Sequence, residues 1–327
     1  MSENIRFGTD GVRGPAGQWP LDEAGAFRIG CGVAAWTKAG CVLIGRDTRE
    51  SGPALEAAIV RGLVAGGATV QQLGVLPTAA VSAAVLDDPH ASAGIMITAS
   101  HNHWKDNGIK VVGAKGHKLV DPSDLVQHFD GSPTPGTGHI EPHPNPLHAW
   151  RARLPQVDLH GTRILLDAAH GAASSAAVEV LEEFGAHVVQ LGCAPNGRNI
   201  NEGVGAMQPP TDLNGCDLAI CLDGDADRLV MVHPTKGILD GDDLLWMLSQ
   251  AISGPIVGTV MSNGGLERAL DGRLVRTAVG DAKVWAEMLR IDSTLGGEPS
   301  GHIMLRDGLP TSDGLYTALR ILSIADG

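Results

Sequence analysis

The chain has 327 residues, more than one ordinary hydrophobic core holds, and this length predicts two or three domains. Hydrophobic residues make up 43% of the sequence, a share that excludes an extended disordered chain. The formal net charge of −13 argues against a surface for nucleic acid or anionic membranes, because both require clustered Lys and Arg. No apolar stretch has the length that crosses a bilayer. Neither a nucleic acid nor a membrane is therefore expected as a partner.

The first chemical signature along the chain is FGTDGVRG (7–14), in which Arg13 lies among glycines. An arginine on a polar, glycine-rich loop can bind phosphate, although a surface turn with an exposed arginine is an equally simple explanation. No apolar segment of the secretory kind precedes it. The five cysteines are odd in number and include no C-x-x-C pair, which favours reduced thiols and a cytoplasmic protein.

A helix is predicted over 21–37, with Asp22 and Glu23 at its start. Within it, GCGVAA (30–35) matches a dinucleotide-binding fingerprint, but that fingerprint requires a strand before its glycines. The helical periodicity leaves no room for such a strand. We therefore interpret these glycines as small residues that let a helix pack closely.

Strand–helix–strand units follow at 41–74 and 163–192 and, in a looser form, at 255–281. The first two end alike, on GATVQQLG and GAHVVQLG. Alternation of this kind predicts right-handed crossovers and mainly parallel sheets. Three separated copies predict three consecutive, related α/β domains with mixed, mainly parallel sheets.

The apolar strand predicted at 95–97 runs directly into a hydroxyl-rich patch that contains Ser100. The carboxyl end of a strand is where α/β sheets bind ligands, so we expect an exposed Ser100 hydroxyl that can carry a group covalently. Ordinary polar loop residues between two strands remain an alternative. Hydrogen-bond donors and one positive charge lie close by in the sequence: His101, Asn102 and Lys110.

Domain boundaries are predicted at two places. The stretch 130–150 is rich in Pro, Gly and His and has no periodicity, which is typical of a linker. The second boundary is placed in or after a helix predicted at 242–254. The predicted domains are therefore 1–150, 151–252 and 253–327.

The strongest local signal is LAICLDGDADRLVMVH (218–233), in which Asp223, Asp225 and Asp227 alternate between two apolar strands. Alternating side chains of an extended segment project to the same side. Three carboxylates so close repel one another, and a divalent cation with oxygen ligands removes that repulsion. Mg²⁺ fits best where a phosphate oxygen completes its coordination. A solvated acidic turn is the alternative.

A last cluster is GGEPSGH (296–302), where Glu298, Ser300 and His302 alternate. In an extended segment they could hold sugar hydroxyls from one side. A tight turn explains the glycines equally well.

Taken in order, FGTDGVRG, TASHN, DGDADR and GEPSGH resemble the signature of the α-D-phosphohexomutase superfamily, and the opening octet is most similar to that of the bacterial phosphoglucosamine mutases. Four motifs in sequence, with GRDTRESG and DNGIKV between them, make the resemblance specific. It implies interconversion of glucosamine 6-phosphate and glucosamine 1-phosphate in a central cleft shielded from water. A phosphoserine and a bisphosphorylated sugar would carry the reaction, with a hexose or glucosamine 1,6-bisphosphate as activator.

The resemblance also implies a role for each matching residue. Ser100 would be the phosphoserine, and its phosphate together with the three aspartates would hold Mg²⁺. Lys110 would help as general acid or base, and Arg228 would steady the phosphoserine region. The remaining matches are Arg13 and His101 around the reacting groups, and Glu298, Ser300 and His302 in the sugar-recognition loop.

Domains I, II and III of the family would then carry the phosphoserine, the metal and the sugar-recognition loop. Family members have a fourth domain that anchors the second phosphate, and this chain is expected to lack it. A small phosphosugar is the expected partner, and the expected state is a monomer or homodimer. Three alternatives stay open: a phosphoglucomutase or phosphomannomutase, a haloacid-dehalogenase-type phosphatase with Asp223 as nucleophile, and a non-catalytic sugar-phosphate-binding homologue.

Overall fold

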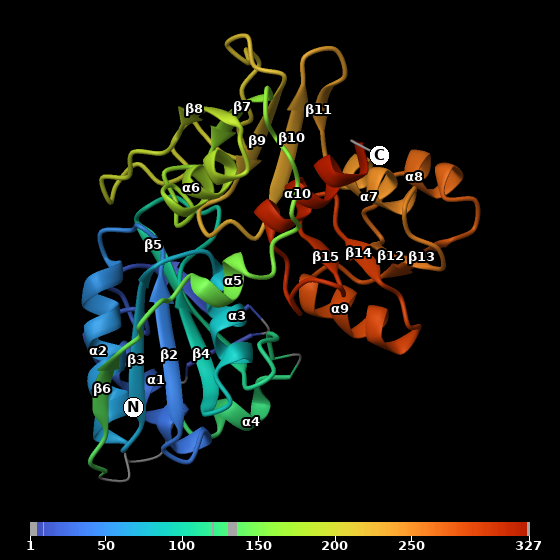
Figure 1. The fold of residues 1–327 in the computed structure, drawn as a ribbon. Helices are drawn as coiled ribbons and strands as arrows, with labels where there is room; N and C mark the ends of the chain where they lie inside the picture. Colours follow the sequence, from blue (N-terminus) through green and yellow to red (C-terminus); the bar gives the residue numbers. More distant parts are fainter. Residues whose placement is uncertain (1–4, 9, 120, 130–135, 326–327) are drawn as a thin grey trace. The chain divides into compact units, whose positions relative to one another are not determined.

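The computed structural model of the chain describes residues 5–8, 10–119, 121–129 and 136–325 (Figure 1). Thr9 of the first motif and residues 130–135 of the predicted linker lie outside the described residues. Contacts divide the chain into two compact units: Met1–Trp150 with Asn196–Asn199, and Arg151–Pro195 with Ile200–Gly327. Among the described residues, no helix combines the length and apolar character that spanning a membrane requires.

The first unit contains a six-stranded sheet in the order β1-β5-β4-β2-β3-β6. Four neighbouring strands, from β4 to β6, run parallel, and β5 is antiparallel to both of its neighbours. The parallel pair that the repeat predicted at 41–74 is confirmed as β2 and β3. The strands are β1 (Val12–Pro15), β2 (Cys41–Arg46), β3 (Thr69–Val75), β4 (Ala91–Ile97), β5 (Asp106–Gly113) and β6 (His139–Pro142).

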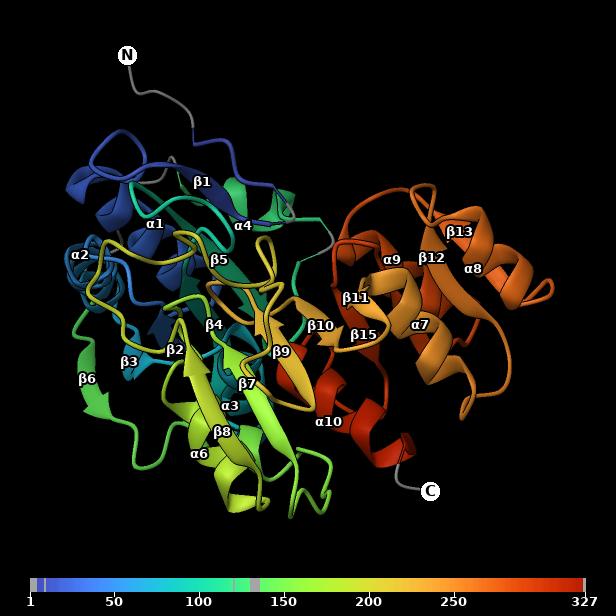
Figure 2. The same cartoon turned by 90° about the horizontal axis from the view of Figure 1, so that it is seen from above.

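Helices cover both faces of this sheet. Figure 2 shows α1 and α2 on one side and α3, which packs on β2 and β4, on the other. The helices of the unit are α1 (Glu23–Trp36), α2 (Gly52–Ala65), α3 (Thr78–Asp87), α4 (Ser123–Val126) and the start of α5 (His148–Arg151).

The glycines of GCGVAA lie inside α1, which confirms their interpretation as packing residues. The helix begins where the sequence predicted, because the Asp22 side chain accepts a hydrogen bond from the Gly25 N–H at 2.8 Å. A Cβ on Gly30 would overlap with the main-chain carbonyl of Ile59 on α2, and one on Gly62 with that of Phe27. Glycine at both positions therefore lets α1 and α2 approach closely.

The second unit contains two sheets of the same general build. The five-stranded sheet has the order β11-β10-β9-β7-β8 and is parallel across β9, β7 and β8. Its strands are β7 (Arg163–Asp167), β8 (His187–Leu191), β9 (Leu218–Leu222), β10 (Leu229–His233) and β11 (Gly237–Leu239), and its crossover helix is α6 (Ala176–Glu183).

The four-stranded sheet has the order β13-β12-β14-β15, with an antiparallel last pair. Each sheet thus joins a parallel part to an antiparallel edge, which confirms three related α/β units with mixed, mainly parallel sheets. The domain limits stay a prediction. The strands are β12 (Ile256–Thr259), β13 (Leu274–Thr277), β14 (Leu295–Gly297) and β15 (Ile303–Leu305), and the helices are α7 (Gly241–Ser249), α8 (Gly264–Ala269), α9 (Asp281–Arg290) and α10 (Gly314–Ala325).

Candidate functional site

The loop that carries Ser100 joins β4 to β5, and we call its residues 98–105 the serine loop. Ser100 follows the carboxyl end of β4 and has a φ of +52°, a left-handed conformation that is unusual for a residue with a side chain. The residue is fully buried, so the expectation of an exposed hydroxyl is wrong for this structure. The loop folds back onto a buried arginine instead of projecting from the sheet.

Two positively charged residues lie on the strands beside this loop. Lys110, which is buried, stands opposite Met96 in the pairing of β5 with β4. Arg13 stands opposite Gly108 in the pairing of β1 with β5. The Oγ of Ser100 is 3.5 Å from Nδ1 of His101. The first unit therefore gathers the four expected residues on two neighbouring strands, β1 and β5, and in the loop that joins β4 to β5.

A buried lysine that the sequence reasoning missed completes this region. Lys118 donates from Nζ to Oδ1 of Asp10 at 3.1 Å, and Arg13 donates from Nη2 to Oδ2 of the same carboxylate at 3.3 Å. Lys118 is only 6% exposed, so its charge is compensated within the protein. No pattern around Lys118 predicted this, because the pairing joins residues 108 positions apart.

Asp47 and Arg49 were also missed, and both are buried directly beneath the serine loop. They belong to GRDTRESG (45–52), a motif that supported the resemblance to the family but for which the sequence predicted no role. Charged residues that follow an apolar strand at once were the available signal, since β2 ends at Arg46.

The second unit holds the acidic triad, Asp223, Asp225 and Asp227, directly after β9. All three residues are buried, and each offers a carboxylate oxygen within 4.8 Å of the others. The segment is a turn and not the extended chain that the alternation predicted. Ala226 has a φ of +60°, and its N–H donates to the Asp223 carbonyl at 3.0 Å. The turn, and not strand alternation, makes the carboxylates converge.

A buried network extends from the triad to the GEPSGH segment. His302 lies between two carboxylates, with Nε2 at 2.9 Å from Asp227 and Nδ1 at 3.1 Å from Glu298. Burial by itself disfavours the charged imidazolium, but the two carboxylates outweigh it and raise the pKa of His302 to about 9. Burial likewise opposes ionisation of Glu298, yet hydrogen bonds from His302 and the Gly280 N–H hold its pKa below the usual range.

Arg228 adds a second positive charge to this network. The main-chain N–H of Arg228 donates to the Asp223 carboxylate at 3.2 Å. Its guanidinium Nε lies 3.3 Å from Nε2 of His302. The guanidinium and the imidazolium compensate part of the triad's charge. The donor set, three buried carboxylates within reach of one ion, is the hard oxygen environment that Mg²⁺ prefers.

GEPSGH forms the hairpin between β14 and β15, as the turn interpretation predicted. Glu298 and His302 face each other at its base, where the Glu298 N–H donates to the His302 carbonyl at 2.9 Å, and Ser300 is exposed at its tip. These residues therefore do not lie on one face of an extended strand. The Gly301 carbonyl accepts from the Leu229 N–H at 3.0 Å, which ties the hairpin to the start of β10.

Replacing Gly301 with alanine is expected to destabilise the protein by about 3 kcal/mol. Gly301 has a φ of +93°, and a Cβ there would clash with the Leu229 carbonyl oxygen. The matched control is Gly254→Ala, because Gly254 has a φ of +91° and open space around it, so only conformational strain of about 1 kcal/mol is added. Urea unfolding measures both. Equal losses for the two variants would contradict a close fit of the hairpin against β10.

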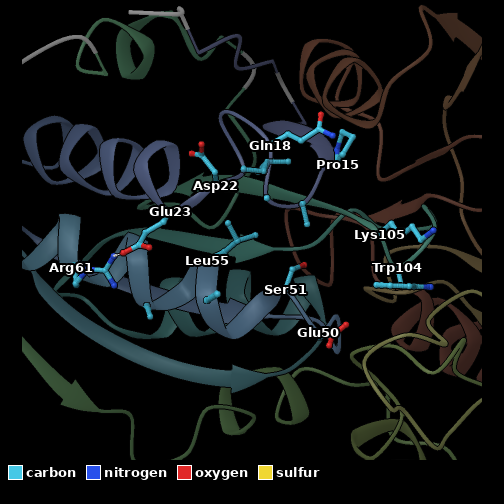
Figure 3. Close-up of a pocket in the computed structure, with 15 residues that line it drawn as sticks. Pro15, Gln18, Asp22, Glu23, Glu50, Ser51, Leu55, Arg61, Trp104 and Lys105 are labelled. Carbon is cyan, nitrogen blue, oxygen red and sulfur yellow. Dashed lines mark hydrogen bonds and ion pairs between the residues drawn. The ribbon is translucent and has the colours of Figure 1, made fainter.

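The first unit also contains a cavity of about 800 Å³ between the segment 15–23, the start of α2 and the end of the serine loop. Figure 3 shows Trp104 and Lys105 at one side and Arg61 at the other. Among the described residues, none of those that the sequence marked for catalysis or binding lines it. The cavity is therefore distinct from the two clusters above.

Family models for phosphoglucomutase/phosphomannomutase match most of the chain. The alpha/beta/alpha domain I model covers residues 4–128, the domain II model covers 147–237 and the domain III model covers 240–327. The phosphoglucosamine mutase of Rhizobium rhizogenes is 42% identical, over 97% of this chain and 78% of the relative. That of Geobacillus kaustophilus is 41% identical with the same coverage.

Solved structures of this family have a similar fold. A phosphoglucomutase/phosphomannomutase family protein from Burkholderia thailandensis has a TM-score of 0.86 at 26% identity, over 99% of this chain and 77% of that one. An N-acetylphosphoglucosamine mutase from Aspergillus fumigatus, solved with GlcNAc-6P and magnesium, shares the fold with a TM-score of 0.64 at 14% identity, over 98% and 77% of the two chains. The chain belongs to the phosphoglucomutase/phosphomannomutase family of phosphosugar mutases, within the α-D-phosphohexomutase superfamily.

Proposed function

We propose that this chain interconverts glucosamine 6-phosphate and glucosamine 1-phosphate. The identity of about 40% to phosphoglucosamine mutases supports the substrate. The observation that carries the proposal is the acidic triad, three buried carboxylates gathered on one turn of a family member. Buried carboxylates are costly unless a cation or other positive groups compensate them, and phosphoryl transfer makes use of such a cation.

Phosphoserine at position 100 is the proposed carrier. In the first half of the reaction the bond between Ser100 Oγ and phosphorus breaks, and a new bond forms between that phosphorus and the free sugar hydroxyl. The proton of this hydroxyl ends on Ser100 Oγ, so the products are neutral serine and the sugar 1,6-bisphosphate. In the second half the bond between the sugar oxygen and the other phosphorus breaks, and this phosphorus bonds to Ser100 Oγ. The proton of the Ser100 hydroxyl goes to the released sugar oxygen. A sugar 1,6-bisphosphate added from solution would load the serine in the same way.

The residues of the first unit would neutralise charge and move the proton. Lys110 is the proposed acid and base, since it lies on the strand beside the serine loop and is buried. Arg13 would bind a phosphoryl oxygen, and His101 would orient the Ser100 hydroxyl, which is 3.5 Å from its Nδ1. Because Ser100 is fully buried here, phosphoryl transfer requires a state in which Oγ is accessible.

The residues of the second unit would hold the metal and the sugar. The acidic triad, together with the Ser100 phosphate, is the proposed Mg²⁺ site, and Mg²⁺ when bound supplies charge stabilisation for the transferring phosphoryl group. Arg228 keeps its proposed role near the phosphoserine. Glu298, Ser300 and His302 are the proposed sugar contacts. A cytoplasmic location and a monomeric or homodimeric state also stay predictions.

Comparison of three substrates tests the proposed sugar. We expect kcat/KM for glucosamine 6-phosphate to exceed that for glucose 6-phosphate and mannose 6-phosphate by at least about 10-fold, since a site built to hydrogen-bond a substrate group rejects analogues without it. The assay uses Mg²⁺ and the matching 1,6-bisphosphate. A preference for glucose or mannose phosphate would favour the phosphoglucomutase/phosphomannomutase alternative.

A further inference from the structure

The guanidinium of Arg49 is completely enclosed beneath the serine loop, and all of its donors are used. Nε donates to Asp47 at 2.8 Å. The four Nη hydrogens are accepted by main-chain carbonyls within seven consecutive residues, at distances from 2.6 to 3.0 Å: those of Ser100, Asn102, His103 and Asp106. Since a guanidinium has five N–H donors, none is left for a phosphate. Arg49 therefore cannot bind a phosphoryl oxygen, which is the role proposed for Arg13.

Asp47 connects this arginine to the start of the serine loop. Its Oδ1 accepts from the Arg49 N–H at 3.0 Å, and its Oδ2 accepts from both Arg49 Nε and the Thr98 hydroxyl, the latter at 2.7 Å. The Thr98 oxygen in turn accepts from the Ser100 N–H at 2.9 Å. The residues Asp47, Arg49 and Thr98 are each at most 1% exposed. The pair of opposite charges leaves this group, which we call the clamp, neutral overall.

The clamp holds both main-chain polar groups of Ser100. Its N–H is bound by Thr98 and its carbonyl by Arg49, on either side of the left-handed φ of +52°. That conformation is unfavourable for a serine and persists only where the surroundings enforce it. The five hydrogen bonds of one buried arginine restrain the backbone around Ser100 more rigidly than the two or three that a lysine provides.

We propose that Asp47, Arg49 and Thr98 are positioning residues that fix Ser100 for phosphoryl transfer, an inference that rests on the proposed function. Phosphoryl transfer depends mainly on in-line placement of the reacting oxygen. A displacement of about 1 Å can lower the rate about 10²-fold. Because the clamp is buried and the donors of Arg49 are used within the protein, its effect would reach the reaction only through the backbone that carries Ser100 Oγ.

Two substitutions at Thr98 separate positioning from stability. Thr98→Val keeps the shape but removes the hydroxyl, whereas Thr98→Ser keeps the hydroxyl and removes a methyl group. We expect the rate of Ser100 phosphorylation by glucosamine 1,6-bisphosphate with Mg²⁺, followed by intact mass, to fall about 10²-fold in Thr98→Val and to stay within about threefold of wild type in Thr98→Ser. Hydrogen exchange of the peptide 98–106 should quicken in Thr98→Val only.

Arg49→Lys is the second variant, for the case that Thr98→Val fails to fold. It keeps the charge, loses at least two of the donors and should give the same loss of rate and of exchange protection. Arg28→Lys is its control, because half-buried Arg28 also donates to a main-chain carbonyl, that of Phe129, outside the serine loop. Unchanged rate and exchange are expected there.

The outcomes distinguish the two proposals. If wild-type protein gains no phosphate, the proposed function fails, and the positioning role fails with it. If wild type is phosphorylated but Thr98→Val and Thr98→Ser react equally fast, the clamp is overturned while the function stands. Unchanged exchange of 98–106 in a folded Arg49→Lys variant would also overturn it.

Discussion

Ser100→Ala is expected to lower mutase turnover by at least ~10³-fold, because it removes the only atom proposed to carry the phosphoryl group. The loss should appear in kcat, and the variant should gain no phosphate from glucosamine 1,6-bisphosphate. Intact mass spectrometry and a coupled assay for glucosamine 1-phosphate measure the two effects. Alanine replaces a buried serine of φ +52°, so a modest loss of stability is expected as well.

Ser92→Ala is the matched control, since Ser92 lies near the start of β4, the strand that leads into the serine loop. It should retain full turnover. Two results would contradict the mechanism in different ways. A Ser100→Ala protein that still releases phosphate from sugar phosphates would point to a phosphatase with Asp223 as nucleophile. A wild-type chain that binds phosphosugars without acquiring phosphate would be the non-catalytic homologue.

Asp225→Asn is expected to abolish Mg²⁺ binding and to lower activity by at least ~10²-fold. In the absence of metal the same change should leave the melting temperature unchanged or raise it, because it removes one of three buried, mutually repelling carboxylates. A metal that binds only the folded state stabilises it, so wild type should melt higher in Mg²⁺ and the variant should not. Thermal unfolding with and without Mg²⁺ measures both effects.

Asp212→Asn serves as the control, because Asp212 is exposed in the same unit and outside the triad. Its melting temperature should rise with Mg²⁺ as in wild type. A rise of equal size in Asp225→Asn would show that the acidic triad is not the metal site. A lower melting temperature of Asp225→Asn without metal would show that Arg228 and His302 already balance the charge.

The fold class and the identity of the chemical motifs could be predicted from the amino-acid sequence alone. Hydrophobic periodicity is local, so the strand–helix–strand units at 41–74 and 163–192 were readable, and so was the helix that contains GCGVAA. The acidic triad was recognisable because its three members lie within five residues. Its geometry was not, because a turn with Ala226 at positive φ replaces the extended segment.

Which distant charged groups compensate one another could not be predicted and is seen only in the folded protein. The pairing of His302 with Asp227 spans 75 positions, and that of Arg49 with the Ser100 carbonyl spans 51. Such pairs depend on which strands become neighbours in a sheet, here β2 beside β4, and the spacing of residues along the chain does not encode this. The burial of Ser100 has the same origin: the serine loop covers Arg49, which follows the end of β2 and must satisfy all of its donors inside the protein.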